Sequence, residues 1–226
     1  LKPIYNLSTR PDEAMGDPKL WDRAEESLKQ ALDGKNLKYN LKQKDGAFYG
    51  PKIDVQIEDA LGREWQIATI QVDFVMLPER FELEYIAEDG SRQRPVAIHR
   101  AIFGSFERFI GIITEHFAGA FPIWLSPVQA VVLPITDVHM AYANKVASAL
   151  RSANVRVELD DRNEKVNYKI REWEIKKAPY MLIVGEKEKS NNSVAVRQHT
   201  KGDLGPMILE AFIQKIVKEI SEKSLT

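Results

Sequence analysis

Three basic side chains, His99, Arg100 and Arg108, lie within ten residues of a largely apolar stretch, residues 95–117. His99 ends a strand-like run, and Arg108 follows Gly104 and Ser105 at the start of a helix-like segment. A neutral imidazole is a common zinc ligand, but a lone His outside an HxxH or HExxH pattern is more often structural. A guanidinium among apolar side chains needs an anion. We therefore expect Arg108 to pair with a carboxylate of the chain, such as Glu107 or Asp73, or with a phosphate near the free N–H groups of the helix start.

A second group of polar side chains surrounds the segment GAFYGPKID, residues 46–54. Its glycines and proline predict a turn that brings Tyr49 and Lys52 to the entrance of a strand. Three polar residues then lie among the aliphatic residues of the returning strand: Gln66, Thr69 and Gln71. A turn with aromatic packing and a wet sheet face would account for these residues, and so would a polar pocket that holds a ligand.

Basic residues are concentrated in one loop and helix of the second half. The segments DDRNEK and NYKIREWEIKK contain Arg162, Lys165, Lys169, Arg171, Lys176 and Lys177. Acidic residues are interspersed among them, so an ordinary salt-bridged helix is one interpretation. A surface that contacts phosphates is the other.

The composition is that of a soluble globular protein. The chain has 226 residues with a formal net charge of −1, 44% hydrophobic residues and no cysteine. Disulfides and thiolate zinc sites are therefore excluded, and a cytoplasmic location is expected. We see no membrane-spanning run and no signal peptide. Residues 1–126 hold 16 basic and 20 acidic residues, whereas residues 127–226 hold 16 and 13, which is compatible with phosphate contacts in the second half.

The first half is predicted to contain one clear helix, several antiparallel strands and a second helix. Asp17 is placed as the N-cap of the first helix, Pro18 as its first residue and Gly34 as its stop. The turn of a hairpin is expected at Asp89-Gly90. The other expected elements are strands at 53–57 and 64–74, hairpin strands within 81–98 and an apolar helix over 104–117. This order is typical of an α+β domain with an antiparallel sheet.

The segment FPIWLSPVQ indicates a linker, and we place a domain boundary at Ser126. The two domains are then 1–126 and 127–226. Strands and helices alternate in the second, in the order β-α-β-α-β-β-α, with Asp137 and Asn163 as the expected caps of its first two helices. This order predicts an α/β domain with a mixed, largely parallel sheet flanked by helices.

Together these segments resemble threonyl-tRNA synthetases, a family of class II aminoacyl-tRNA synthetases. The matching stretches follow the family's order and cover nearly the whole chain: LSTRP, GAFYGPKID, WQIATIQVDF, PVAIHRAIFGSFERFIGIITEHFAG, FPIWLSPVQ, RNEKVNYKIRE, PYMLIVGEKE and VAVR. Within them, IHRAIFGSFERF resembles class II motif 3. The resemblance implies that residues 1–126 are the C-terminal part of a class II catalytic domain and that 127–226 are an anticodon-binding domain.

The resemblance also implies an active site in the first domain. Arg108 resembles the arginine that binds the γ-phosphate of ATP, and Lys52 resembles an active-site lysine, so both are expected to be catalytic. His99 resembles one of three ligands of a zinc ion that coordinates the amino and hydroxyl groups of threonine, and Mg²⁺ is expected with ATP. Arg108 and His99 should therefore face one pocket. The substrate-binding residues carried over are Tyr49 and Gln71 for threonine, and Gln66, Thr69, Ser105 and Arg108 for ATP.

In the second domain, four residues match the base-contacting positions of the family: Asn163, Arg171, Glu188 and Arg197. The resemblance implies that these side chains pair with the edges of splayed anticodon bases, which makes tRNA(Thr) the expected partner.

Parts of the family's pattern have no counterpart in these residues, namely motifs 1 and 2, the editing domain, and a Cys and a His that complete the zinc site. Because the chain also lacks an initial Met, we expect that it begins inside a longer protein and is inactive alone. The complete protein is expected to be a homodimeric threonine–tRNA ligase. The alternative is a non-catalytic tRNA- or RNA-binding paralogue that kept the anticodon-binding domain. The retained Gln66, Gln71, His99 and Arg108 favour the enzyme.

Overall fold

The computed structural model describes residues 1–225, which form two compact units divided between His116 and Phe117. The predicted boundary at Ser126 lies after this division. The segment between the two positions is attached to the second unit, because the guanidinium of Arg156 donates hydrogen bonds to the carbonyl oxygens of Trp124 and Ser126.

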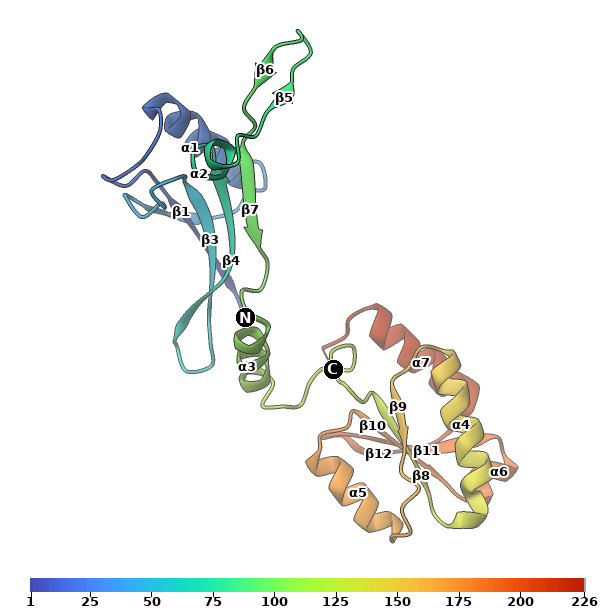
Figure 1. Ribbon diagram of the computed structural model, residues 1–226. Helices are drawn as coiled ribbons and strands as arrows, with labels where there is room; N and C mark the ends of the chain where they lie inside the picture. Colours follow the sequence, from blue (N-terminus) through green and yellow to red (C-terminus); the bar gives the residue numbers. More distant parts are fainter. Residues whose placement is uncertain (226) are drawn as a thin grey trace. The chain divides into compact units, whose positions relative to one another are not determined.

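The first unit is built on a five-stranded sheet (Figure 1). Its strands lie in the order β2 (Tyr39–Lys42), β1 (Pro3–Ser8), β3 (Lys52–Glu58), β4 (Glu64–Asp73) and β7 (Ala97–Ala101). Strand β1 pairs in parallel with β2, and all other pairs are antiparallel. The predicted antiparallel α+β architecture is therefore confirmed, although β1 and β2 were not foreseen.

Helix α1 (Pro18–Asp33) covers one face of this sheet, as the capping pattern predicted. The side chain of Asp17 accepts a hydrogen bond of 2.9 Å from the amide of Lys19. The buried side of the helix repeats at helical spacing and consists of Trp21, Ala24, Leu28 and Leu32. Because Leu28 and Leu32 pack on Leu7 and Ile53, the odd-numbered residues at this end of β3 point toward the helix. The even-numbered residues of β3 therefore point to the opposite face.

Between β4 and β7 the structure differs from the predicted long hairpin. A short helix, α2 (Met76–Arg80), follows β4, and the hairpin consists of only β5 (Tyr85–Ile86) and β6 (Arg92–Gln93). The helix forms because the carboxylate of Asp73 accepts hydrogen bonds from the amides of Val75, Met76 and Leu77 at its N-terminus. Helix α3 (Phe106–His116) then ends the unit close to its predicted place.

The second unit is a five-stranded mixed sheet with helices on both faces. Its strands lie in the order β12 (Gly202–Ile208), β11 (Ser193–Gln198), β10 (Tyr180–Val184), β8 (Ala130–Pro134) and β9 (Val157–Leu159). The pairs β8–β9 and β8–β10 are parallel, whereas β10–β11 and β11–β12 are antiparallel. The expected mixed sheet is confirmed, but it is only half parallel because β12 was missed.

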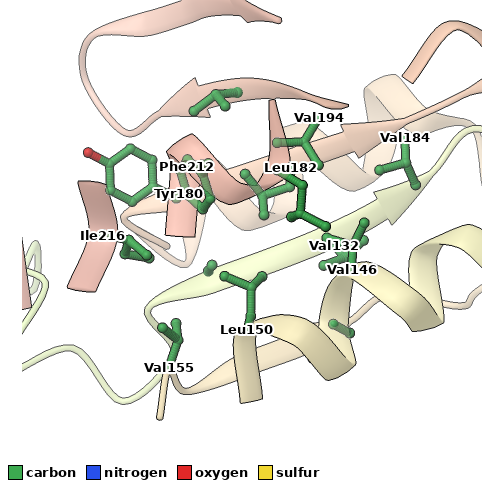
Figure 2. Close-up of a cluster of buried hydrophobic side chains, with 14 of the residues drawn as sticks. Val132, Val146, Leu150, Val155, Tyr180, Leu182, Val184, Val194, Phe212 and Ile216 are labelled. Carbon is green, nitrogen blue, oxygen red and sulfur yellow. The ribbon is translucent and has the colours of Figure 1, made fainter. Parts of the chain in front are cut away.

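The core of this unit is divided between the two faces of the sheet. Figure 2 shows the larger cluster, in which α4 (Met140–Ser152) and α7 (Leu209–Ser221) pack on one face through side chains such as Leu150 and Phe212. Helix α5 (Val166–Ile175) packs on the other face through Trp173. One further helix, α6 (Glu186–Ser190), was not predicted.

Two predicted helix caps are wrong. Asp137 begins a short 3-10 turn, Asp137–His139, that precedes α4. Asn163 lies two residues before the position that caps α5, which is Lys165. Among residues 1–225, no helix is long and apolar enough to cross a membrane.

Candidate functional site

Strand register collects the predicted polar side chains on the face of the first sheet that lies opposite α1. Lys52 of β3 pairs with Gln71 of β4, and Gln71 pairs with His99 of β7. Asp54 pairs with Thr69 one step further along the same strands. Since side chains that are directly opposite share a face, these five lie together on that face.

A β-bulge adds Gln66 to this group. The register shifts between Val55 and Gln56, so that Gln56 pairs with Gln66 although Asp54 pairs with Thr69. The extra residue in β4 turns Gln66 toward the face that carries Thr69, which simple alternation would forbid. The Nε2 atom of Gln66 accordingly reaches Asp54, at 2.7 Å.

Asp54 is the centre of the group and was not singled out from the sequence. Its Oδ1 accepts hydrogen bonds from Gln66 and from the hydroxyl of Thr69, the latter at 2.6 Å. Its Oδ2 lies 2.6 Å from the Nζ atom of Lys52. The Asp54 side chain is only 7% exposed, so three predicted site residues are anchored on one buried carboxylate. Its even-numbered position in the alternating KIDVQI pattern was the available signal.

Tyr49 reaches the same face from the turn before β3. Its hydroxyl donates to Oε1 of Gln71 at 3.0 Å, and Nε2 of Gln71 donates to the carbonyl oxygen of Gly50 at 3.4 Å. A Cβ atom at Gly50 would lie 1.6 Å from the carbonyl oxygen of Val72, so only glycine fits there. The ring of Tyr49 is centred 6.0 Å from that of His99. The turn therefore places an aromatic hydroxyl beside the polar face.

His99 is held by a buried carboxylate. Its Nε2 lies 3.0 Å from Asp73, whose side chain is fully buried. Burial raises the pKa of Asp73, but the hydrogen bonds from His99 and from the amides of α2 outweigh burial and lower the pKa below its usual value. A carboxylate on one ring nitrogen is the arrangement that orients metal-binding histidines, and here Nδ1 would be the nitrogen that could bind a metal.

A complete metal site is not found within the described residues 1–225, since no group of three His, Cys, Asp or Glu side chains comes together there. His99 fits a zinc ion as one ligand with a carboxylate behind it, but the other ligands of such an ion would have to come from elsewhere.

Arg108 does not behave as predicted. It is exposed, and its guanidinium stacks over the ring of Trp65 at 5.6 Å. The hydroxyl oxygen of Ser105 accepts a hydrogen bond from the Arg108 amide, and its carbonyl oxygen accepts one from the amide of Phe109. Within residues 1–225, the guanidinium has no ion pair, neither with Asp73 nor with Glu107. Trp65 pairs with Ile57, an odd-numbered residue of β3, and so belongs to the face opposite Gln66. The structure therefore does not bring Arg108 together with His99.

In the second unit, two of the four predicted base-contacting residues lie at the carboxyl edge of the parallel strands. Asn163 is exposed in the loop after β9 and lines a hollow of about 460 Å³ together with Thr136 and Lys165. Glu188 lies in α6, directly after β10, where its carboxylate accepts a hydrogen bond of 3.0 Å from the amide of Gly185. The carboxyl ends of β8, β9 and β10 meet at one edge because these strands are parallel.

The other two predicted base-contacting residues are Arg171, on α5, and Arg197, on β11. Glu174 of α5 lies 3.0 Å from His199, just after β11. Arg171 is one turn before Glu174 on α5, and Arg197 is two residues before His199 on β11. Arg171 is exposed. Arg197 is half-buried, and its Nε atom has no hydrogen-bond partner within the described chain.

The loop that carries Asn163 is fixed by Asp160. The Asp160 carboxylate accepts hydrogen bonds from Nε and Nη2 of Arg162, at 2.8 and 2.6 Å, and from the indole of Trp173 at 2.8 Å. The hydrogen bonds from Arg162 outweigh the opposing effect of burial and, with that from Trp173, lower the pKa of Asp160 to about 2. The buried ammonium of Lys169 donates to the Asp160 carbonyl oxygen at 3.0 Å.

Comparison with known proteins matches both units to families. The model of the family described as tRNA synthetase class II core domain (G, H, P, S and T) matches residues 13–117, and that of the anticodon binding domain matches residues 129–219. Threonine–tRNA ligase of Desulforamulus reducens is 55% identical over 97% of this chain, and that of Caldanaerobacter subterraneus is 57% identical over 97%. The chain spans 34% of the length of each relative.

Solved structures agree with these matches. The RNA binding domain of threonyl-tRNA synthetase from Cryptosporidium parvum Iowa II superposes with a TM-score of 0.86 at 40% identity, over 96% of this chain and 55% of that one. A putative threonyl-tRNA synthetase from Aeropyrum pernix superposes with a TM-score of 0.73 at 27% identity, over 98% and 55% of the two chains. Similarity to this one family thus runs through the class II core residues and the anticodon-binding domain, and the chain belongs to the threonyl-tRNA synthetase family.

Proposed function

We propose that the protein to which this chain belongs activates L-threonine with ATP to threonyl adenylate and transfers the threonyl group to tRNA(Thr). The observation that carries the proposal is the polar sheet face in a chain 55% identical to a threonine–tRNA ligase. That face gathers six of the predicted site residues: Tyr49, Lys52, Gln66, Thr69, Gln71 and His99.

The reaction needs positioning and charge stabilisation more than proton transfer. The threonine carboxylate attacks the α-phosphate of ATP, and pyrophosphate leaves. Lys52 is the cation paired with Asp54 and would bind an anionic group of the substrates. Tyr49 and Gln71 lie beside His99, where the threonine side chain would bind. A zinc ion held in part by His99 would supply an open Lewis-acidic position for the threonine hydroxyl, which valine lacks.

Arg108 is proposed, by resemblance to motif 3, to bind the γ-phosphate of ATP, although in this structure it lies with Trp65 on the face opposite Gln66. Its guanidinium is exposed and has no carboxylate partner within residues 1–225, so it is available for an anion. Ser105 lies at the start of α3, where amides without helical partners also favour an anion. Mg²⁺ is proposed to accompany the nucleotide.

tRNA binding is proposed for the second unit, which matches the anticodon binding domain. Arg171 on α5 and Arg197 on β11 offer guanidinium groups, and Asn163 and Glu188 offer an amide and a carboxylate at the carboxyl edge of the sheet. Such groups can hydrogen-bond the exposed edges of unstacked bases. Dimer formation and a cytoplasmic location are proposed by resemblance to the family.

Threonine-dependent ATP–pyrophosphate exchange tests the proposal. The product of the complete reading frame that contains this sequence should catalyse exchange with threonine and not with valine, whereas the 226-residue chain should not. A product that binds tRNA(Thr) without any exchange would replace the proposal with its alternative, a non-catalytic RNA-binding paralogue. Robust exchange by the 226-residue chain would show that the described residues suffice for adenylate formation.

A further inference from the structure

We propose that Asp54 is a positioning residue of this active site, which decides the hydrogen-bonding atoms that Lys52, Gln66 and Thr69 present to the substrates. The inference rests on the proposed function, because it concerns how the same site binds its ligands. Asp54 is suited to this role because it is buried and contacts all three side chains at 2.6 to 2.7 Å.

The carboxylate fixes the orientation of two uncharged partners. An ionised carboxylate only accepts hydrogen bonds, so Gln66 must face Asp54 with its amide nitrogen and turn its carbonyl oxygen away. Thr69 has one hydroxyl hydrogen, and the 2.6 Å contact with Asp54 takes it in preference to the 3.3 Å contact with the Ile53 carbonyl oxygen. The Thr69 oxygen is then left with lone pairs only. Both residues therefore present acceptors.

The carboxylate also holds a cation, the ammonium group of Lys52. Lys52 lies 2.6 Å from Asp54 and its side chain is 22% exposed, so part of the ammonium group remains accessible. A free lysine side chain would sample many rotamers, each of which would have to be lost when a substrate binds. Pairing with a buried partner removes this freedom in advance, which favours a defined position for a substrate anion.

Tyr49 also presents a hydrogen-bond acceptor to the substrates. Its hydroxyl donates to Gln71, which leaves the Tyr49 oxygen as an acceptor. The face therefore offers three acceptor oxygens, on Tyr49, Gln66 and Thr69, beside the ammonium of Lys52. This set is complementary to a ligand that carries N–H or O–H donors next to an anionic group. An amino acid with its ammonium and carboxylate has this chemistry, and so does an adenine amino group with its phosphates.

The substitution Asp54→Asn should keep the contacts with Gln66 and Thr69 and remove the one with Lys52. The asparagine oxygen can still accept from Gln66 and Thr69, but its NH₂ group would replace the oxygen that faces Lys52 and cannot pair with an ammonium. In the full-length protein, kcat/KM for threonine-dependent exchange should fall by about 100-fold. Asp22→Asn, an exposed position on α1, is the matched control and should leave the rate unchanged.

A double-mutant cycle distinguishes a positioning role of Asp54 from a merely structural one. If Asp54 acts through Lys52, then Asp54→Asn in a Lys52→Met background should lower the rate by less than about threefold. Full additivity of the two losses would overturn the inference, and so would wild-type activity in the single Asp54→Asn variant. If the wild-type full-length protein shows no exchange, the proposed function fails instead.

A measurement on the wild-type 226-residue chain covers the case in which the variant does not fold. In ¹⁵N NMR spectra, the Lys52 ammonium and the Gln66 side-chain amide should both exchange with solvent more slowly than those of Lys2 and Gln30, which lie exposed elsewhere in the unit. Exchange as fast as at these two reference residues would contradict the proposed anchoring.

Discussion

Acidification should selectively weaken the second unit through Asp160. The pKa of its carboxyl is lowered from 3.8 to about 2, mainly because Arg162 donates hydrogen bonds to the charged form, with a further one from Trp173. One pKa unit corresponds to about 1.4 kcal/mol, so the ionised group contributes about 2 kcal/mol to the free energy of unfolding at neutral pH. Because the folded-state pKa is the lower one, this contribution is complete above about pH 4 and is lost as the pH falls through about 2.

Urea unfolding of the 226-residue chain, followed through the indole N–H signal of Trp173, would measure this contribution. Asp160→Asn should lower the free energy of unfolding by about 2 kcal/mol at neutral pH, and the gap from the wild type should narrow below about pH 4. The matched control Asp161→Asn, at the exposed neighbouring position, should stay within about 0.5 kcal/mol of the wild type. A gap that is the same at all pH values would refute the reasoning, because the ionised form would then not be the source of the stability.

Three further changes test the two units. Arg197→Ala should weaken tRNA(Thr) binding by about tenfold or more in a filter-binding assay, because Arg197 is one of the predicted base-contacting residues. The control Arg151→Ala, on α4, should bind tRNA(Thr) as the wild type does. Equal affinities of the Arg197→Ala variant and the wild type would count against this interface. His99→Asn should lower the zinc affinity of the full-length protein by at least about tenfold, measured by metal analysis after dialysis. The control His116→Asn should leave the zinc content unchanged. An unchanged zinc content in the His99→Asn variant would show that His99 is not a zinc ligand. Trp21→Ala should destabilise the first unit by about 3–5 kcal/mol in urea, since Trp21 is fully buried, and a loss below about 1 kcal/mol would contradict its place in the core.

The sequence predicted best what is decided by local rules. Helix α1 was found because Asp17 and Pro18 begin it and its apolar residues repeat at helical spacing. The polar residues of β4 were recognised individually, but their common face could not be derived, since the bulge that turns Gln66 toward Thr69 has no signature of its own in the sequence. Asp54 was missed for a related reason. Two of its three partners, Gln66 and Thr69, lie on a neighbouring strand, and register decides which residues those are.

Arg108 shows where periodicity misleads. The apolar content of α3 suggested a buried helix and hence a buried cation, but only Ile112 is buried, while Phe106 and Ile110 are 74% and 54% exposed. A hydrophobic stripe specifies that a face is apolar and does not specify which part of a protein covers it. Whether Arg108 and His99 face one pocket therefore depends mainly on what surrounds α3, and it is a weak test of whether the chain belongs to the family. Membership of the family is carried by similarity along 97% of the chain, including the polar face, where each side chain is held by a partner that the same chain supplies.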